Sequence, residues 1–130
     1  MIVDSSALIA VLKEEPEAEG FLRELTRAVP AKRLSAANYL EAAIVVDANR
    51  NPVLSRRFDD LIARTGIVVE PVTREQAEIA RAAYRDFGKG GGHPAGLNFS
   101  DCFAYALAKA TREPLLFQGS DFSKTDVAAA

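Results

Sequence analysis

Four carboxylates stand where apolar segments meet polar ones, although they are far apart along the chain: Asp4, Glu41, Asp101 and Asp121. Asp4 ends the opening apolar run Met1–Val3, and Asp121 follows the run Leu115–Phe117 after a short polar turn. Carboxylate oxygens are the ligands that hard divalent cations such as Mg²⁺ and Mn²⁺ prefer. If the fold brings these four acids together, the sequence predicts a metal site made entirely of oxygen ligands.

A site of this kind suits the hydrolysis of phosphodiester bonds. Divalent cations make water nucleophilic near neutral pH and stabilise charge on the phosphate, and paired ions lie about 3.5–4 Å apart. Mg²⁺ keeps several of its waters, so one or two carboxylates are enough for each ion. Without a bound ion, clustered carboxylates repel one another, and we expect some of their pKa values to rise.

Each acid also has an ordinary structural interpretation when it is considered alone. Asp4 could cap a helix, and Asp101 has the spacing from Asn98 that is typical of a capping pair. Glu41 could lie at the solvent edge of an amphipathic helix, and Asp121 could stabilise a turn. Only the convergence of all four in space would favour the metal site over these separate roles.

Other groupings of reactive residues give weaker signals. The run Gly90–Gly92 lacks the Gly-Lys-Ser/Thr ending of a nucleotide-binding loop, and His93 is the only histidine, which excludes a histidine-rich metal site. Cys102 has apolar neighbours on an expected helix, which predicts a buried structural thiol. Ser5 and Ser6 have no partner base, which argues against serine hydrolysis.

The elements that must position the four acids alternate between strand and helix. Short apolar or β-branched runs predict strands at 1–4, 34–36, 67–69 and 115–117. Helices are expected at 5–12, from 16 onward, and at 37–50, 53–65, 73–87 and 98–110. Their start signals are Ser5 or Ser6, Pro16, the capping box of Thr73, and Asn98.

This alternation predicts an α/β protein with a mostly parallel sheet and helices on both faces. Ligands of such sheets usually collect beyond the carboxyl ends of the strands. Asp4 and Asp121 follow strands, whereas Glu41 and Asp101 lie early in helices that could start on the same side. The topology therefore makes the convergence of the four acids plausible.

Bulk properties narrow the class further. The 130 residues fit one domain spanning residues 1–130, with no linker or internal repeat. A net charge of -2 argues against a basic nucleic-acid coat, but not against a nuclease whose acids hold cations. The chain has one cysteine and no apolar run of about 18 residues. We therefore expect a cytoplasmic protein without a membrane span.

Three segments, together with Glu41, resemble a PIN-domain ribonuclease of the VapC toxin family: Met1–Leu8, Gly96–Ala108 and Leu115–Phe122, the last followed by Thr125–Asp126. The similarity runs in order over essentially the whole chain, and its most specific part surrounds Asp101. The resemblance implies a three-layer α/β/α sandwich with a mostly parallel central sheet. It also implies an endoribonuclease that depends on Mg²⁺ or Mn²⁺.

The resemblance assigns the catalytic and metal-binding roles to the same four acids, Asp4, Glu41, Asp101 and Asp121. It gives Ser6 a supporting role as a hydroxyl that orders the site, while Asp126 is an alternative to Asp121 as the fourth acid. The implied partners are an RNA substrate, a VapB-like antitoxin that wraps the toxin, and a second copy in a homodimer.

The leading hypothesis is thus a toxin-type endoribonuclease of a type II toxin-antitoxin system. Its main alternative is a PIN-like module that binds RNA or protein without cutting. A metal phosphatase acting on small substrates is a third possibility, since the same ions could serve it.

Overall fold

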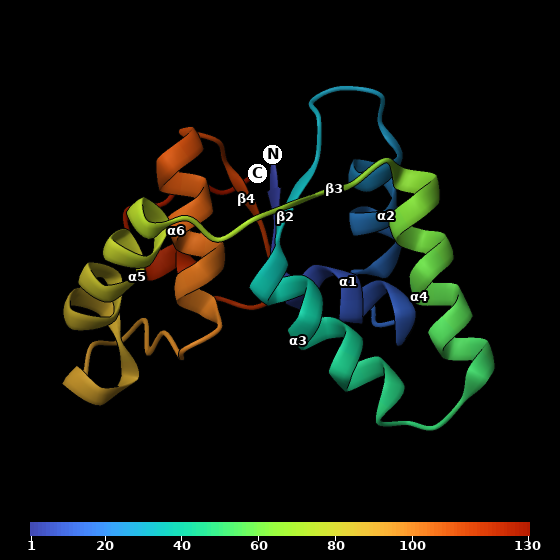
Figure 1. Ribbon diagram of the computed structural model, residues 1–130, viewed down its shortest axis with the longest axis horizontal. Helices are drawn as coiled ribbons and strands as arrows, with labels where there is room; N and C mark the ends of the chain where they lie inside the picture. The colour runs from blue at the N-terminus through green and yellow to red at the C-terminus, as the bar shows by residue number, and fades with distance from the viewer.

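The computed structural model describes residues 1–130, and its centre is one sheet of four short strands. These are β1 (Ile2–Val3), β2 (Arg33–Ser35), β3 (Val68–Glu70) and β4 (Leu115–Leu116). They lie in the order β3-β2-β1-β4, and every pairing is parallel (Figure 1). The predicted parallel sheet is confirmed, with strand ends that differ by one residue from the predicted bounds.

Six helices connect and flank the strands: α1 (Ser5–Leu12), α2 (Ala18–Thr26), α3 (Ala36–Asp47), α4 (Pro52–Thr65), α5 (Arg74–Phe87) and α6 (Asp101–Thr111). Two single turns of 3₁₀ helix, η1 (Lys89–Gly91) and η2 (Phe122–Lys124), complete the chain. None of the helices combines the length and the apolar composition that crossing a membrane requires.

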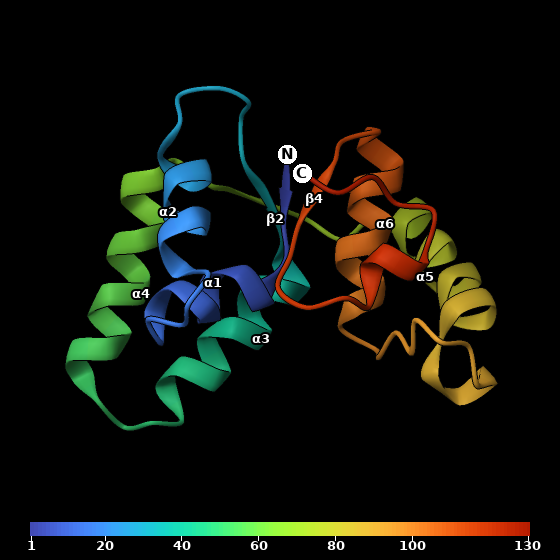
Figure 2. The same ribbon diagram turned by 180° about the vertical axis from the view of Figure 1, so that it is seen from behind.

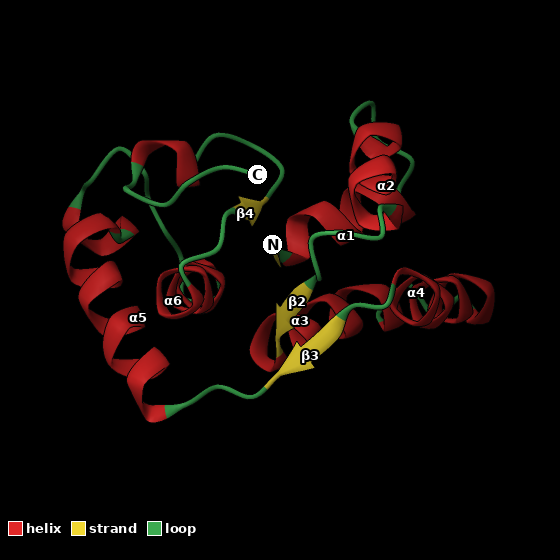
Figure 3. Ribbon diagram, turned by 90° about the horizontal axis from the view of Figure 1, so that it is seen from above, coloured by secondary structure: helices red, strands yellow, loops and turns green.

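The centre of the sheet is covered on both faces, because the buried residues of β1 and β4 alternate between two cores. Met1 and Val3 belong to a core shared with α1, α3 and α4, whereas Ile2 between them belongs to a second core with α5 and α6. Leu116 and Leu115 of β4 divide between the two cores in the same way. Successive side chains of a strand point to opposite faces. Figure 3 shows the resulting three layers, which confirm the predicted α/β/α sandwich.

The structure decides between the two capping alternatives at the start of α1. Asp4, rather than Ser5 or Ser6, is the N-cap, and its Oδ2 accepts a hydrogen bond from the Ser6 backbone N–H at 3.0 Å. Extended backbone at Asp4, with φ of -82° and ψ of 152°, directs the carboxylate back over the first turn. The same residue therefore ends a strand and begins a helix.

Three helix bounds were wrong, one of them the start of α6, which is Asp101 and not Asn98. Pro16 lies in the turn before α2, which begins at Ala18, so its fixed φ shapes the approach rather than the first helical turn. Helix α3 ends at Asp47, before the predicted Arg50, and Arg50 has a positive φ of 51°. That left-handed residue turns the chain toward α4.

The predicted capping hydrogen bonds of Thr73 and Asn98 are confirmed, although the residue directly before α6 is Ser100. Thr73 Oγ1 accepts the Gln76 N–H at 3.1 Å. Asn98 Oδ1 accepts the Asp101 N–H at 2.9 Å, and Asp101 Oδ2 accepts the Asn98 N–H at 3.0 Å. This reciprocal pair satisfies backbone donors that would otherwise be unpaired at the start of a helix. It also fixes the position of the Asp101 carboxylate.

Candidate active site

Asp4 is the most buried of the four acids, with 3% of its surface exposed. Burial raises its pKa to about 6, and the negative charges of Asp101 and Glu41 act in the same direction, against hydrogen bonds from Ser6. Its Oδ1 is buried and has no hydrogen-bond partner. Because an unpaired buried carboxylate oxygen is unfavourable, this atom is suited to accept a cation or to carry a proton.

Glu41 reaches the same place from α3. Its Oε1 accepts a hydrogen bond of 2.5 Å from the Ser5 hydroxyl, which lies one residue beyond Asp4. Its charge contributes to the raised pKa of Asp4 and also to that of Asp101. Helix α3 therefore places Glu41 at the carboxyl end of β1, where the hydrogen bond from Ser5 orients its carboxylate.

Asp101 is the first residue of α6, and Asp121 is the N-cap residue of η2. Burial raises the pKa of Asp101, and the negative charges of Asp121 and Glu41 raise it further. The hydrogen bond from the Asn98 N–H acts in the opposite direction. Asp121 is exposed and is not among the charges that perturb Asp4. The four acids therefore extend from a buried end at Asp4 to an exposed end at Asp121.

Asp126, the alternative fourth acid, is engaged elsewhere. Its carboxylate accepts hydrogen bonds from the Tyr105 hydroxyl at 2.6 Å and from Lys109 Nζ at 3.0 Å. The Tyr105 hydrogen bond, and then that of Lys109, lower the pKa of Asp126. The structure therefore groups Asp121, and not Asp126, with Asp101.

The donor set fits a hard divalent cation only in an open form. No group of three or more His, Cys, Asp or Glu side chains is close enough to form a ready-made cage. The predicted all-oxygen cluster is thus a loose grouping rather than a closed one. Because Mg²⁺ retains several waters and needs one or two direct carboxylates, the unpaired Oδ1 of Asp4 and the neighbouring acids still suit it.

Ser6 connects the buried end of the cluster to the loop that follows β4. Its Oγ accepts the backbone N–H of Gln118 at 3.0 Å. The Gln118 side-chain amide donates to Glu17 Oε2 at 2.9 Å. This chain of contacts holds the loop that leads to Asp121 against α1, which is a geometric basis for a supporting role of Ser6.

Comparison with known proteins gives the family. A family model described as the PIN domain matches residues 1–128. Ribonuclease VapC28 of Mycobacterium tuberculosis is 57% identical over 130 residues, which cover 100% of this chain and 97% of that protein. The chain belongs to the VapC branch of the PIN-domain family. Ribonuclease VapC of Mycolicibacterium smegmatis is 46% identical over 129 residues, covering 99% of this chain and 98% of that protein.

Solved structures of low sequence identity share the fold of this PIN domain. VapC20 of Mycobacterium tuberculosis, a sarcin-ricin loop cleaving toxin, superposes with a TM-score of 0.73 at 17% identity, covering 99% of this chain and 97% of that one. A toxin-antitoxin complex from Klebsiella pneumoniae gives a TM-score of 0.73 at 17% identity, with 99% and 95% covered. FitAcB from Neisseria gonorrhoeae superposes with a TM-score of 0.68 at 20% sequence identity, covering 99% of this chain and 96% of that one.

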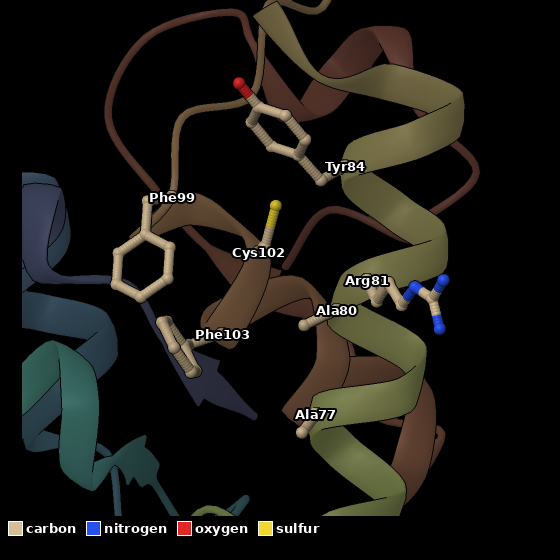
Figure 4. A pocket seen from close by; sticks show the side chains of 7 residues that line it. All are labelled: Ala77, Ala80, Arg81, Tyr84, Phe99, Cys102 and Phe103. Carbon is tan, nitrogen blue, oxygen red and sulfur yellow. The ribbon is translucent and has the colours of Figure 1, made fainter. Parts of the chain in front are cut away.

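An apolar pocket lies between α5 and the beginning of α6 in this PIN domain, and none of the four acids lines it. Figure 4 shows its lining: Ala77, Ala80, Arg81, Tyr84, Phe99, Cys102 and Phe103. The Cys102 thiol, which sequence reasoning assigned to a buried structural role, is 4% exposed. Burial raises its pKa to about 11, with a smaller effect from the Asp101 charge, so the thiol stays protonated near neutral pH. The prediction for Cys102 is confirmed.

Sequence reasoning missed two polar side chains that contact this VapC-type site. It considered Ser5 only as a possible helix cap, whereas the Ser5 hydroxyl orients Glu41. It also passed over Asn38, which is completely buried and donates to the Ser100 carbonyl at 2.9 Å. The available signal was spacing, because Asn38 lies three residues before Glu41 and therefore on the same side of α3.

Proposed function

We propose that this protein is a VapC-type toxin that cleaves RNA phosphodiester bonds with the help of Mg²⁺ or Mn²⁺. The observation that carries the proposal is the buried Asp4, whose unpaired Oδ1 lies among the charges of Glu41 and Asp101. Whole-length relatives named as ribonucleases support the choice of RNA as substrate.

In this proposal Asp4 and Asp101 hold the cation directly. A bound divalent cation would activate water and stabilise charge on the phosphate. Asp4, with a pKa of about 6, is mostly ionised near neutral pH, and a nearby cation would favour that ionised form further. The rigid caps of α1 and α6 hold both carboxylates in place before the ion arrives.

Glu41 and Asp121 complete the site from either side. The Ser5 hydrogen bond holds Glu41 at the carboxyl end of β1, where Glu41 would orient a water for attack on the phosphate. Asp121, being exposed, remains accessible to solvent at the outer end, where it can hold a water or a second ion.

We further propose a VapB-like antitoxin as the protein partner, a homodimer as the assembly, and the cytoplasm as the compartment. The Klebsiella pneumoniae neighbour is a toxin-antitoxin complex, which supports the first of these by shared fold. Because an antitoxin must block access to the acids, co-expression with the cognate antitoxin should abolish cleavage.

The test compares cleavage of an end-labelled structured RNA by wild type, Asp4→Asn, Asp101→Asn and the matched control Asp126→Asn. We expect Mg²⁺-dependent cutting by wild type and by Asp126→Asn, and a loss of at least about a hundredfold in the other two. Circular dichroism checks that each variant is folded. Undiminished cutting by both Asp4→Asn and Asp101→Asn would refute the assignment.

Two further assays separate the alternatives. Calorimetric titration with Mn²⁺ should give heat with wild type and much less with Asp4→Asn. RNA binding without any Mn²⁺-dependent heat or cutting would instead indicate a non-cleaving module. Hydrolysis of nucleoside monophosphates in preference to RNA would indicate a phosphatase.

A further inference from the structure

The two helices that carry Glu41 and Asp101 belong to opposite halves of the molecule. Helix α3 packs into the core with α1 and α4, whereas α6 packs into the core with α5 (Figure 2). The central sheet separates these cores. The spacing between Glu41 and Asp101 therefore depends on contacts that cross from α3 to the beginning of α6.

Asn38 makes such a contact through a hydrogen bond. It lies in the first turn of α3, and its Nδ2 donates to the Ser100 carbonyl oxygen at 2.9 Å. Ser100 immediately precedes Asp101, and its carbonyl also accepts the Phe103 N–H at 3.1 Å within the first turn of α6. One side chain thus joins the turn that leads to Glu41 with the residue that precedes Asp101.

Packing alone does not explain an asparagine at this position. Asn38 has no exposed surface, and its Oδ1 is buried without a hydrogen-bond partner. An unpaired buried polar atom costs stability, whereas an apolar side chain of similar size would avoid that cost. Residues that break such local rules are expected at functional sites. Hence the Asn38 amide carries a role beyond filling space.

We propose that Asn38 is a positioning residue, which sets the separation of Glu41 and Asp101 by holding the Ser100 carbonyl. This inference rests on the proposed nuclease function, because the distance between the two acids matters only if they share cations or water. The Asn38 side chain is hydrogen-bonded to neither acid and acts through the backbone that leads into α6. Small displacements of reacting groups, about 1 Å, can reduce rates by about a hundredfold.

The first test compares Asn38→Leu with Val46→Ala, measured on the same RNA at a temperature where both are folded. Val46 is on the same helix and 1% exposed, so its truncation weakens the α3 core away from the acids. We expect Asn38→Leu to lower kcat by about tenfold or more, with KM changed less than about threefold. Val46→Ala should keep kcat within about twofold of wild type, since only packing is altered.

The second test needs neither metal nor RNA. Amide hydrogen exchange of the metal-free protein should be faster at Asp101 and Phe103 in Asn38→Leu than in wild type. This increase should exceed the increase in α4, which serves as the reference for a general loss of stability. Val46→Ala should show no increase in exchange at Asp101 and Phe103 beyond the increase seen in α4. If Asn38→Leu fails to fold, Asn38→Ser replaces it, because the shorter hydroxyl cannot span to the Ser100 carbonyl.

The outcomes separate this inference from the proposed function. If wild type cuts no RNA, the nuclease proposal fails, and hydrogen exchange alone decides whether Asn38 holds α6. If wild type cuts RNA and Asn38→Leu keeps wild-type kcat, or loses only what Val46→Ala loses, the positioning role is refuted. Local exchange at Asp101 indistinguishable from that of wild type would refute it as well.

Discussion

Replacing Asp4 with asparagine should stabilise the metal-free protein while removing its activity. Burial raises the pKa of Asp4 from the ordinary value of 3.8 to about 6. At about 1.36 kcal/mol for each pH unit, this difference corresponds to roughly 3 kcal/mol of destabilisation when Asp4 is ionised. Asparagine keeps an oxygen that can accept the Ser6 N–H, so the cap of α1 is retained.

The sign of the pH dependence follows from which state holds the proton more tightly. The folded protein binds it more tightly than the unfolded chain, so wild-type stability falls as pH rises from about 4 to about 6 and is level above that. The Asp4→Asn variant lacks this contribution. Its advantage over wild type should therefore be near zero at pH 4 and full, at roughly 3 kcal/mol, above pH 6.

Urea unfolding in EDTA at several pH values between 4 and 8 measures this difference directly. Adding Mg²⁺ should then narrow the gap at pH 7.5, because an ion that binds only the folded wild type stabilises it. The control is Asp126→Asn, because the pKa of Asp126 is lowered by Tyr105 and Lys109, so its replacement should destabilise the protein at neutral pH. An Asp4→Asn advantage that does not change with pH, or a variant less stable than wild type at pH 7.5, would refute the reasoning.

Three further predictions concern residues in or next to the candidate active site. Ser5→Ala should lower kcat by about threefold to tenfold, because Glu41 loses the hydroxyl that orients it, and steady-state kinetics on RNA would detect it. Asp121→Asn should reduce cleavage less than Asp101→Asn does, since Asp121 is exposed at the outer end; equal losses would contradict that order. Cys102 should react slowly with a thiol reagent at pH 8 in the native protein and quickly in urea, because burial raises its pKa to about 11.

The sequence predicted the fold well wherever local signals were strong. The first strand is an example. A strand that is buried on both faces needs consecutive apolar residues, and Ile2 packs into one core while Met1 and Val3 pack into the other. Thr73 and Asn98 likewise marked helix starts through side chains that bond to nearby backbone. Local chemistry decided these features, so a linear pattern was enough to predict them.

The bounds of α1 were predicted correctly, but its cap was ambiguous because neighbouring residues could each serve. Ser5 and Ser6 are both good caps by residue type, yet Asp4 takes that position because β1 ends at Val3 and leaves Asp4 extended. The serines are then free for longer contacts, Ser5 with Glu41 and Ser6 with the Gln118 N–H. The position at which β1 ends, and not the capping propensity of the serines, therefore determines which residue is the N-cap of α1.

By itself the sequence determined the residue types of the site, four acids at the borders of apolar segments, and the alternation that forms a parallel sheet. Only the tertiary structure decided which acids meet, because Asp121 and Asp126 are five residues apart and face different partners. It also decided how the acids are held, through Ser5 and Asn38 across long stretches of chain. Side-chain charge and hydrogen bonds act through space over a few ångströms, and distance along the chain does not specify that proximity.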